Sequence, residues 1–215
     1  MLIEPKHKNI ITVEGTDGTG KTSFVKELVS TLKRKGLTSN FFPIIESTAF
    51  GEIYKKQYIS GLLNPALETT GMLYSCMSTL NMVHSDASRY YNYCVIDRSF
   101  TSFNVYQILT NEYSWIKDTY VKQILSNSDY TSLINVYLTV DTNVAFERMK
   151  ARGRLDAIES RGPDYQKQLT KNYEKTFNMY PQLAPHFRID TTNITTQQAV
   201  NMFIQNYLQP QANQK

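Results

Sequence analysis

Residues 15–22 read Gly15-Thr16-Asp17-Gly18-Thr19-Gly20-Lys21-Thr22, which matches the phosphate-binding pattern G-x-x-x-x-G-K-[ST] at every fixed position. The glycines of such a loop, the P-loop, let several backbone N–H groups point inward, and the next helix presents its positive end to the same spot. Lys21 adds an ammonium for the β- and γ-phosphates, and Thr22 adds a hydroxyl for Mg²⁺. We therefore expect an ATP site formed by Gly15, Thr16, Gly18, Thr19, Gly20, Lys21, Thr22 and Ser23.

The segments on either side of the P-loop have the composition of a strand and a helix. Residues Ile10–Val13 form a short β-branched run, as in a buried strand. After the loop, Phe24, Leu28 and Leu32 recur every four residues, and the stripe ends in Lys33-Arg34-Lys35-Gly36. The sequence therefore predicts a strand, a phosphate-binding loop and an amphipathic helix in succession.

Composition places the chain among globular α/β proteins. Its 215 residues with 41% hydrophobic content predict one domain, ending in a polar, flexible tail at 209–215. Residues 1–9 lack the apolar segment of a signal peptide, and no apolar run has the length of a membrane helix. The net charge of +4, without a dense basic stripe, argues against a nucleic-acid partner. Cys76 and Cys94 suit reduced core residues, so we expect a cytoplasmic protein without a membrane partner.

Strand and helix patterns alternate along the whole chain. Strands are expected over 10–13, 38–45, 93–96, 133–140 and 187–190, with helices after the P-loop and over 66–89, 103–109, 115–125, 143–150, 165–180 and 196–207. Such alternation predicts a parallel sheet covered on both faces. The expected fold is therefore a three-layer α/β/α P-loop domain with a five-stranded parallel sheet and a short mobile lid. Ligands then bind beyond the carboxyl ends of the strands, where the P-loop lies.

Two charged residues follow the third expected strand directly. Asp97, at the carboxyl end of a strand beside a P-loop, can hold Mg²⁺. The adjacent Arg98 can span two phosphates with its planar guanidinium. A surface ion pair is the alternative, but the position beside the P-loop favours a role in the site.

A loop rich in arginine, residues 151–163, is expected to form the lid. Phosphoryl transfer needs cations that surround the migrating charge, and a loop bounded by Gly153 and Gly162 can close and exclude water. A solvated charged surface is the alternative reading. The arginines in and beside this loop are Arg148, Arg152, Arg154 and Arg161.

Polar residues follow Asp97 in a pattern that suits an acceptor site. Ser102 and Tyr106 lie four residues apart and share a helix face, and Gln107 can present a donor and an acceptor to a base edge. Tyr74, in the preceding expected helix, can stack on a base or pack in the core, and the sequence leaves both open.

Together these motifs resemble the thymidylate kinase family of P-loop nucleoside monophosphate kinases. The family's E-G-x-D-G-x-G-K-[ST] is similar to residues 14–22, and its D-R-Y-x-x-S-S-x-x-Y-Q is similar to residues 97–107. Its lid R-G-x-L-D-R-I-E resembles residues 152–159, and its helix segment L-L-F-x-A-x-R resembles residues 72–78. The resemblance spans nearly the whole chain.

The resemblance implies ATP and Mg²⁺ as cofactors, dTMP as acceptor in dTTP biosynthesis, and a homodimer. Besides Lys21 of the P-loop, the expected catalytic residues are Asp17 near the transferring phosphate, Arg98 on the phosphates, and Arg154 or Arg161 from the lid. Arg148 and Arg152 would line the donor nucleotide, and Thr22 and Asp97 would assist the metal. The implied substrate-binding residues are Asp17, Glu46, Tyr74, Ser78, Asp97, Arg98, Ser102, Tyr106 and Gln107.

Three positions depart from the family pattern, and two of them are acceptor contacts, so they bear on the acceptor more than on the fold or the donor. The family's arginine after the second strand, which grips the acceptor phosphate, is absent from residues 43–48. Its base-reading arginine falls at Ser78, and its second lid arginine falls at Ala157. Deoxynucleoside kinases share this architecture and carry a glutamate after the second strand that takes the 5′-hydroxyl proton, which Glu46 resembles.

Three functions therefore stay open, in this order. The first is a deoxynucleoside monophosphate kinase acting on dTMP, which needs no general base. The second is a deoxynucleoside kinase with Glu46 as base. The third is a nucleotide-dependent switch without transferase activity. The apolar stretch 103–109 is expected either to form a dimer face or to belong to the core.

Overall fold

The computed structural model describes residues 10–60, 65–107, 122, 126, 133–153 and 161–209, and they form alternating strands and helices. The strands are β1 (Ile10–Glu14), β2 (Ser39–Pro43), β3 (Tyr93–Asp97), β4 (Ile134–Thr139) and β5 (Phe187–Asp190). The α-helices are α1 (Lys21–Arg34), α2 (Ala49–Ile59), α3 (Pro65–Ser85), α4 (Phe100–Gln107), α7 (Thr142–Ala151), α8 (Pro163–Met179) and α9 (Thr196–Phe203). Short helical turns are η1 (Ala87–Arg89), η4 (Pro181–Leu183) and η5 (Ile204–Leu208).

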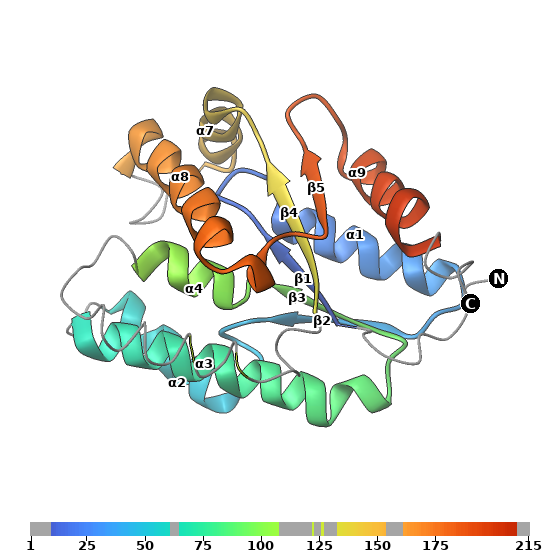
Figure 1. Ribbon diagram of the computed structural model, residues 1–215, viewed down its shortest axis with the longest axis horizontal. Helices are drawn as coiled ribbons and strands as arrows, with labels where there is room; N and C mark the ends of the chain where they lie inside the picture. Colours follow the sequence, from blue (N-terminus) through green and yellow to red (C-terminus); the bar gives the residue numbers. More distant parts are fainter. Residues whose placement is uncertain are drawn as a thin grey trace.

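All five strands are parallel, in the order β2-β3-β1-β4-β5. The central strand β1 pairs with β3 on one side and β4 on the other, and all five of its residues are buried. Figure 1 shows α1 and α9 on one face of the sheet and α3, α4 and α8 on the other. The three-layer fold with a five-stranded parallel sheet is therefore confirmed.

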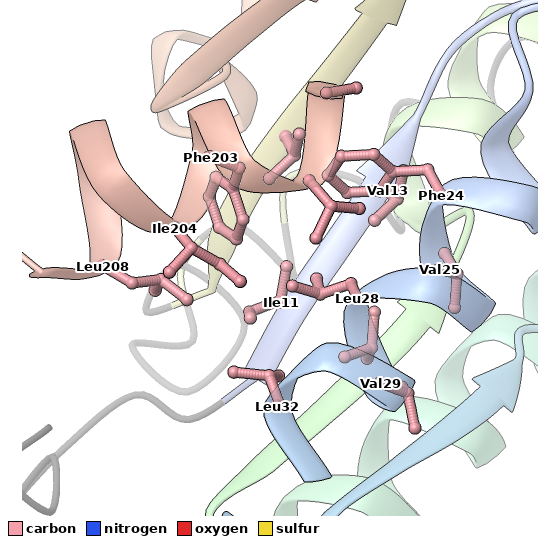
Figure 2. Close-up of a cluster of buried hydrophobic side chains, with 14 of the residues drawn as sticks. Ile11, Val13, Phe24, Val25, Leu28, Val29, Leu32, Phe203, Ile204 and Leu208 are labelled. Carbon is pink, nitrogen blue, oxygen red and sulfur yellow. The ribbon is translucent and has the colours of Figure 1, made fainter. Parts of the chain in front are cut away.

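Alternate residues of the strands build a separate core on each face. Ile11 and Val13 of β1 point between α1 and α9, where Phe24, Leu28 and Phe203 meet them (Figure 2). On the other face, strand residues such as Ile10, Cys94 and Ile96 pack against α3 and α4. A strand covered on both faces favours apolar residues on both sides, which explains why Ile10, Ile11 and Val13 occupy three of the five positions of β1.

Burial makes the thiols of both cysteines inaccessible to solvent and raises their pKa values. Cys76 of α3 and Cys94 of β3 are free and buried. Burial raises the pKa of the Cys94 thiol to about 12 and raises that of Cys76 further still. The prediction that both are unpaired core residues is confirmed.

Several predicted element boundaries were wrong. The second strand ends at Pro43 rather than at residue 45, because residues 44–47 form a turn in which Ser47 Oγ donates to Pro43 O at 2.6 Å. Helix α3 ends at Ser85, and α4 begins at Phe100, three residues earlier than predicted. The last helix becomes a π-helical turn after Phe203. Helix α2 was not predicted, and the helix predicted over 115–125 lies, apart from residue 122, outside the described residues.

The stretch 103–109 belongs to the core as far as it is described. Phe103 and Val105 are at most 2% exposed, and they pack within the chain's own clusters. These two side chains are therefore not available to a second subunit. Among the described residues, no helix combines the length and apolar character needed to cross a bilayer.

Gly71 in the middle of α3 gives a stability prediction with a definite sign. In an open helix position, replacing glycine by alanine stabilises a protein by about 1 kcal/mol. At Gly71 a Cβ would lie 2.4 Å from Tyr54 Cδ2 of α2, a ring that is 4% exposed and cannot easily move. We therefore expect Gly71→Ala to lower the free energy of unfolding by about 1–3 kcal/mol, as measured by urea denaturation.

The control for Gly71→Ala removes the ring. In a Tyr54→Ala background the same substitution meets open space, so it should be neutral or stabilising. A Gly71→Ala single variant more stable than the unsubstituted protein would show that α2 and α3 do not pack as described.

Candidate active site

A cavity of about 790 Å³ opens at the carboxyl edge of the sheet. It is lined by the P-loop after β1, by the chain that follows β2 and β3, by α7, and by the segment after β5. This is the edge at which open parallel sheets bind ligands. The cavity is therefore the candidate active site, and the predicted phosphate-binding residues Gly18, Thr19, Gly20, Lys21, Thr22 and Ser23 all line it.

The P-loop lies so close to the sheet and to α7 that two of its glycines have no room for a side chain. A Cβ on Gly15 would lie 2.5 Å from Leu138 O of β4, and φ at Gly15 is +148°. A Cβ on Gly18 would lie 2.6 Å from Ala145 O of α7, and φ at Gly18 is +80°. Glycine tolerates these angles and this close approach, which explains why these two positions of the loop carry glycine.

Lys21 is buried against its own loop. Its Nζ donates to Thr16 O at 2.7 Å and lies 3.7 Å from Asp17 Oδ1, and the residue is 7% exposed. Burial, with a contribution from nearby Arg98, lowers the pKa of Lys21 to about 8. Its ammonium is therefore poorly solvated in the free protein, and a phosphate would be a better partner than the loop carbonyl.

This pKa predicts how ATP affinity depends on pH. Bound phosphates favour the charged ammonium, so the pKa of Lys21 is higher in the complex than the value of about 8 in the free protein. Affinity should therefore be constant below that pH and fall as pH rises through it, by up to about tenfold per pH unit. Calorimetric titration of the protein with MgATP between pH 6.5 and 9.5 measures this. Lys21→Met should abolish the dependence, and a flat profile in the unsubstituted protein contradicts the prediction.

Thr22 and Asp97 provide oxygen atoms that fit a magnesium ion. Thr22 Oγ1 donates to Asp97 Oδ2 at 2.8 Å, which brings the two predicted metal residues together across α1 and β3. The other oxygen, Asp97 Oδ1, is buried and has no hydrogen-bond partner in the described part of the chain. A hydroxyl and a carboxylate with an unused oxygen are the hard ligands that magnesium prefers beside a nucleotide.

Arg98 and Asp17 form an ion pair at the mouth of the P-loop. Arg98 Nη2 lies 2.5 Å from Asp17 Oδ1, and the Tyr106 hydroxyl donates to Asp17 Oδ2 at 3.2 Å. Burial alone would raise the pKa of Asp17, but Arg98 and Lys21 outweigh burial and hold that pKa below its ordinary value. These predicted residues are therefore brought together as one charged group.

The backbone of Arg98 adopts an uncommon conformation. Its φ is +71°, the one positive value at a non-glycine residue in the described ranges, and its N–H donates to Val13 O at 3.0 Å. Such angles cost about 1–3 kcal/mol and persist only where the surroundings enforce them. The strain directs the guanidinium back over the P-loop instead of onward along α4.

A buried polar network beneath Arg98 was largely missed by the sequence reasoning. Glu14 at the end of β1 is 2% exposed and accepts hydrogen bonds from Ser99 Oγ at 2.6 Å and Ser102 Oγ at 2.5 Å. Tyr173 of α8 joins the same group. The predicted approach of Ser102 to the acceptor is not supported, because its hydroxyl is buried on Glu14 and Ser102 does not line the cavity. The one feature of the sequence that could have indicated this network is Glu14, a single carboxylate at the end of a mostly apolar strand.

The donor end of the cavity is fixed by Arg148 of α7. Its Nη2 donates to Thr191 O at 2.7 Å, and its Nη1 donates to Gly18 O at 3.4 Å, so it ties the segment after β5 to the P-loop. Arg152 is exposed and also lines the cavity. Arg161 is exposed, packs over the Tyr165 ring at 5.0 Å, and does not line it. Further lining residues that the sequence did not indicate are Ile194, Thr195, Thr196 and Ala199.

The acceptor end is less complete in the described structure. Glu46 lines the cavity and forms an ion pair with Lys55 of α2. Tyr74 is 55% exposed and packs edge-on against Phe50 at 4.4 Å, so a core role for Tyr74 is wrong. Tyr74 and half-buried Ser78 lie on α3 and do not line the cavity. Arg154 and the side chain of Gln107 lie outside what the structure describes.

Comparison with known proteins covers almost the whole chain. Residues 13–200 match the protein family described as thymidylate kinase. A thymidylate kinase from Vibrio parahaemolyticus is 23% identical over 185 residues, which span 82% of this chain and 86% of that protein. A thymidylate kinase from an Exiguobacterium species is 27% identical over 177 residues, which span 80% of this chain and 82% of that protein.

Solved structures agree on the fold. A thymidylate kinase from Candida albicans, described as having broad substrate specificity, superposes with a TM-score of 0.68 at 16% identity and covers 96% of this chain and 93% of its own. A deoxyadenosine kinase from M. mycoides with bound dATP superposes with a TM-score of 0.59 at 22% identity and covers 91% of this chain and 97% of its own. The two classes of kinase considered from the sequence are thus both represented among structures of this fold.

Proposed function

Since the chain belongs to the thymidylate kinase family, whose members use ATP to phosphorylate a nucleoside monophosphate, we propose that its acceptor is dTMP and its product dTDP. The observation that carries the proposal is the charged group at the P-loop. Lys21, Arg98 and Asp17 surround one point of a cavity that opens toward β2 on one side and toward β5 on the other. Donor and acceptor nucleotides can therefore meet there from opposite sides.

The reaction needs positioning and charge neutralisation more than it needs a base. The attacking oxygen of a monophosphate is already ionised, so no side chain has to remove a proton. In this proposal the P-loop amides and Lys21 hold the β- and γ-phosphates of ATP, and Arg98 stabilises charge on the transferred group. Asp17 orients Arg98 and Lys21 and lies near the acceptor sugar.

Other residues complete the proposed site. Thr22 and Asp97 would hold Mg²⁺, which when bound supplies charge neutralisation of the phosphate oxygens. Arg148 and Arg152 would contact the donor, and Arg154 or Arg161 would approach from the lid at residues 151–163. On the acceptor side, Tyr74, Ser78, Tyr106 and Gln107 remain proposed contacts, and closure of the site around a bound nucleotide would be needed to bring Tyr74 and Ser78 to it.

An acceptor panel tests this function directly. The protein is mixed with MgATP and with each of dTMP, dCMP, dAMP, dGMP, thymidine, deoxycytidine and deoxyadenosine, and ADP formation is followed. ADP that forms with dTMP supports the proposal. Formation with a nucleoside supports a deoxynucleoside kinase, and ATP binding without acceptor-dependent ADP supports a nucleotide-dependent switch.

The observation that favours the deoxynucleoside kinase is Glu46 at the end of β2, with no arginine in residues 43–48. Its ion pair with Lys55 of α2 opposes that reading, because the carboxylate is already occupied by an ammonium group instead of being free to face a 5′-hydroxyl. We therefore expect Glu46→Gln to change kcat with dTMP by less than about fivefold, whereas loss of a general base costs about 10²–10⁴-fold. Steady-state rates with dTMP and thymidine measure this. A 10²-fold loss with dTMP would contradict the proposed acceptor chemistry.

The same function suits a reducing compartment. Free, buried Cys76 and Cys94 support a cytoplasmic location, which is also part of the proposal. A homodimer is proposed on the family resemblance alone, and size-exclusion chromatography with light scattering tests it.

A further inference from the structure

The hydroxyl of Tyr173 lies beneath the first turn of the P-loop. Tyr173 belongs to α8 and is completely buried. Its OH is 2.8 Å from Ser102 Oγ, 3.1 Å from Glu14 Oε2 and 3.2 Å from Gly15 O, and Gly15 N donates to it at 3.4 Å. One phenol thus connects the end of β1, the P-loop and α4 to the helix that follows the lid segment.

Glu14 explains why a hydroxyl is needed at this point. A buried carboxylate is costly unless donors surround it. Ser99 and Ser102 supply two hydroxyl donors, and Tyr173 supplies the third. Burial raises the pKa of Tyr173 well above its ordinary value, so the phenol stays protonated and available to donate at any working pH.

The same contacts reach Arg98 on the other side. Arg98 Nη1 donates to Ser102 Oγ at 3.3 Å and to Gly15 O at 3.4 Å, while its Nη2 holds Asp17. Both acceptors of Nη1 are therefore atoms that Tyr173 also contacts. Tyr173 itself does not line the cavity, so any effect on the reaction has to pass through these neighbours.

We propose that Tyr173 is a positioning residue for phosphoryl transfer, whose hydroxyl fixes the orientation of Arg98 through Ser102 and the Gly15 carbonyl. The inference rests on the proposed phosphoryl transfer. It predicts a loss in the chemical step without a loss of donor affinity, because most P-loop amides and Lys21 keep their places when the phenol oxygen is removed.

The test compares two Tyr→Phe substitutions in one aromatic cluster. Tyr173→Phe removes the hydroxyl and keeps the ring, and we expect kcat to fall by about 10- to 100-fold with the KM for ATP nearly unchanged. Tyr137→Phe is the matched control, because its ring centroid lies 5.0 Å from that of Tyr173, it is 1% exposed, and it does not line the cavity. Its kcat should equal that of the unsubstituted protein.

A double-mutant cycle with Ser102→Ala separates positioning from packing. If both residues act through Arg98, the double variant should be no slower than the slower single variant. Losses that multiply, or a Tyr173→Phe enzyme with the kcat of Tyr137→Phe, overturn the proposal. An equal fall in melting temperature and kcat in both Tyr→Phe variants also overturns it, because that result means packing. If Tyr173→Phe does not fold, Ser102→Ala breaks the same link from α4 and has to show the same split between kcat and KM.

The unsubstituted protein is assayed in parallel with dTMP. An inactive unsubstituted protein contradicts the proposed acceptor. The same variants are then assayed with the acceptor that the panel selects, and the comparison of Tyr173→Phe with Tyr137→Phe and the double-mutant cycle test the role of Tyr173 as before.

Discussion

We expect Lys21→Ala to lower kcat for phosphoryl transfer by about 10²–10³-fold, the size of effect seen when a preorganised charge donor is removed from a developing negative charge. Lys21 lies within the P-loop, and its ammonium donates to Thr16 O at 2.7 Å and makes a looser contact, 3.7 Å, with Asp17 Oδ1. Because those contacts are easily exchanged for phosphate oxygens, the ammonium can follow the γ-phosphate during transfer.

The fold should survive this substitution. Lys21 is buried and its pKa of about 8 means that the folded protein disfavours its charged form, so removing the ammonium should not lower the melting temperature. Calorimetry and single-turnover transfer measured on the same sample separate the two effects. Lys33→Ala, at an exposed position in the last turn of α1, is the matched control. A Lys21→Ala enzyme that keeps the unsubstituted rate would remove the P-loop from the mechanism.

Arg98→Lys should be nearly as damaging, although it keeps the charge. Arg98 uses its planar guanidinium to reach Asp17, Ser102 and Gly15 at once, and a lysine ammonium cannot reproduce that geometry. Loss of an arginine that stabilises the transferred phosphoryl group costs about 10³–10⁵-fold, and we expect about 10²–10³-fold for the lysine because the charge remains.

The comparison for Arg98→Lys is Arg188→Lys. Arg188 of β5 pairs with Glu174 and is 47% exposed, so the same chemical change there should leave kcat unaltered. Steady-state rates over a range of ATP concentrations should show that Arg98→Lys acts on kcat more than on KM. Equal rates for the two variants would show that Arg98 only pairs with Asp17 and has no part in transfer.

The parts of the site that could be predicted from the sequence are formed by residues that lie close together in the chain. The P-loop could be recognised because its pattern, Gly15 and Gly20 followed by Lys21-Thr22, lies within eight consecutive residues, and Asp97 could be placed because it ends an apolar run. A parallel sheet places the carboxyl ends of β1 and β3 at the same edge, which predicts Thr22 and Asp97 in one site. The structure adds that β1 and β3 are neighbours and that the two side chains touch.

What the sequence could not predict depends on contacts between distant segments. Tyr173 donates a hydrogen bond to Glu14, which lies 159 positions earlier in the chain. Within α8, Tyr173 fits the buried stripe of an amphipathic helix, so its neighbours in the sequence do not indicate that contact. Arg148 was expected to contact the donor, but its hydrogen bonds to Thr191 O and Thr192 O are fixed only by how α7 and β5 pack. Helix α2 was missed because its apolar residues do not form one clear face: Ile53 is 58% exposed, while Tyr54 beside it is buried.

The inaccessibility of both native thiols makes this protein convenient for site-specific labelling. Cys76 and Cys94 are buried and resist ionisation, so maleimide reagents should leave the unsubstituted protein unmodified under native conditions. A single cysteine introduced in place of exposed Lys150 or Lys167, which flank the arginine-rich loop, would then carry a fluorophore without background. Its emission during nucleotide binding would report, in real time and without a crystal, whether the expected closure of that loop takes place and at which binding step.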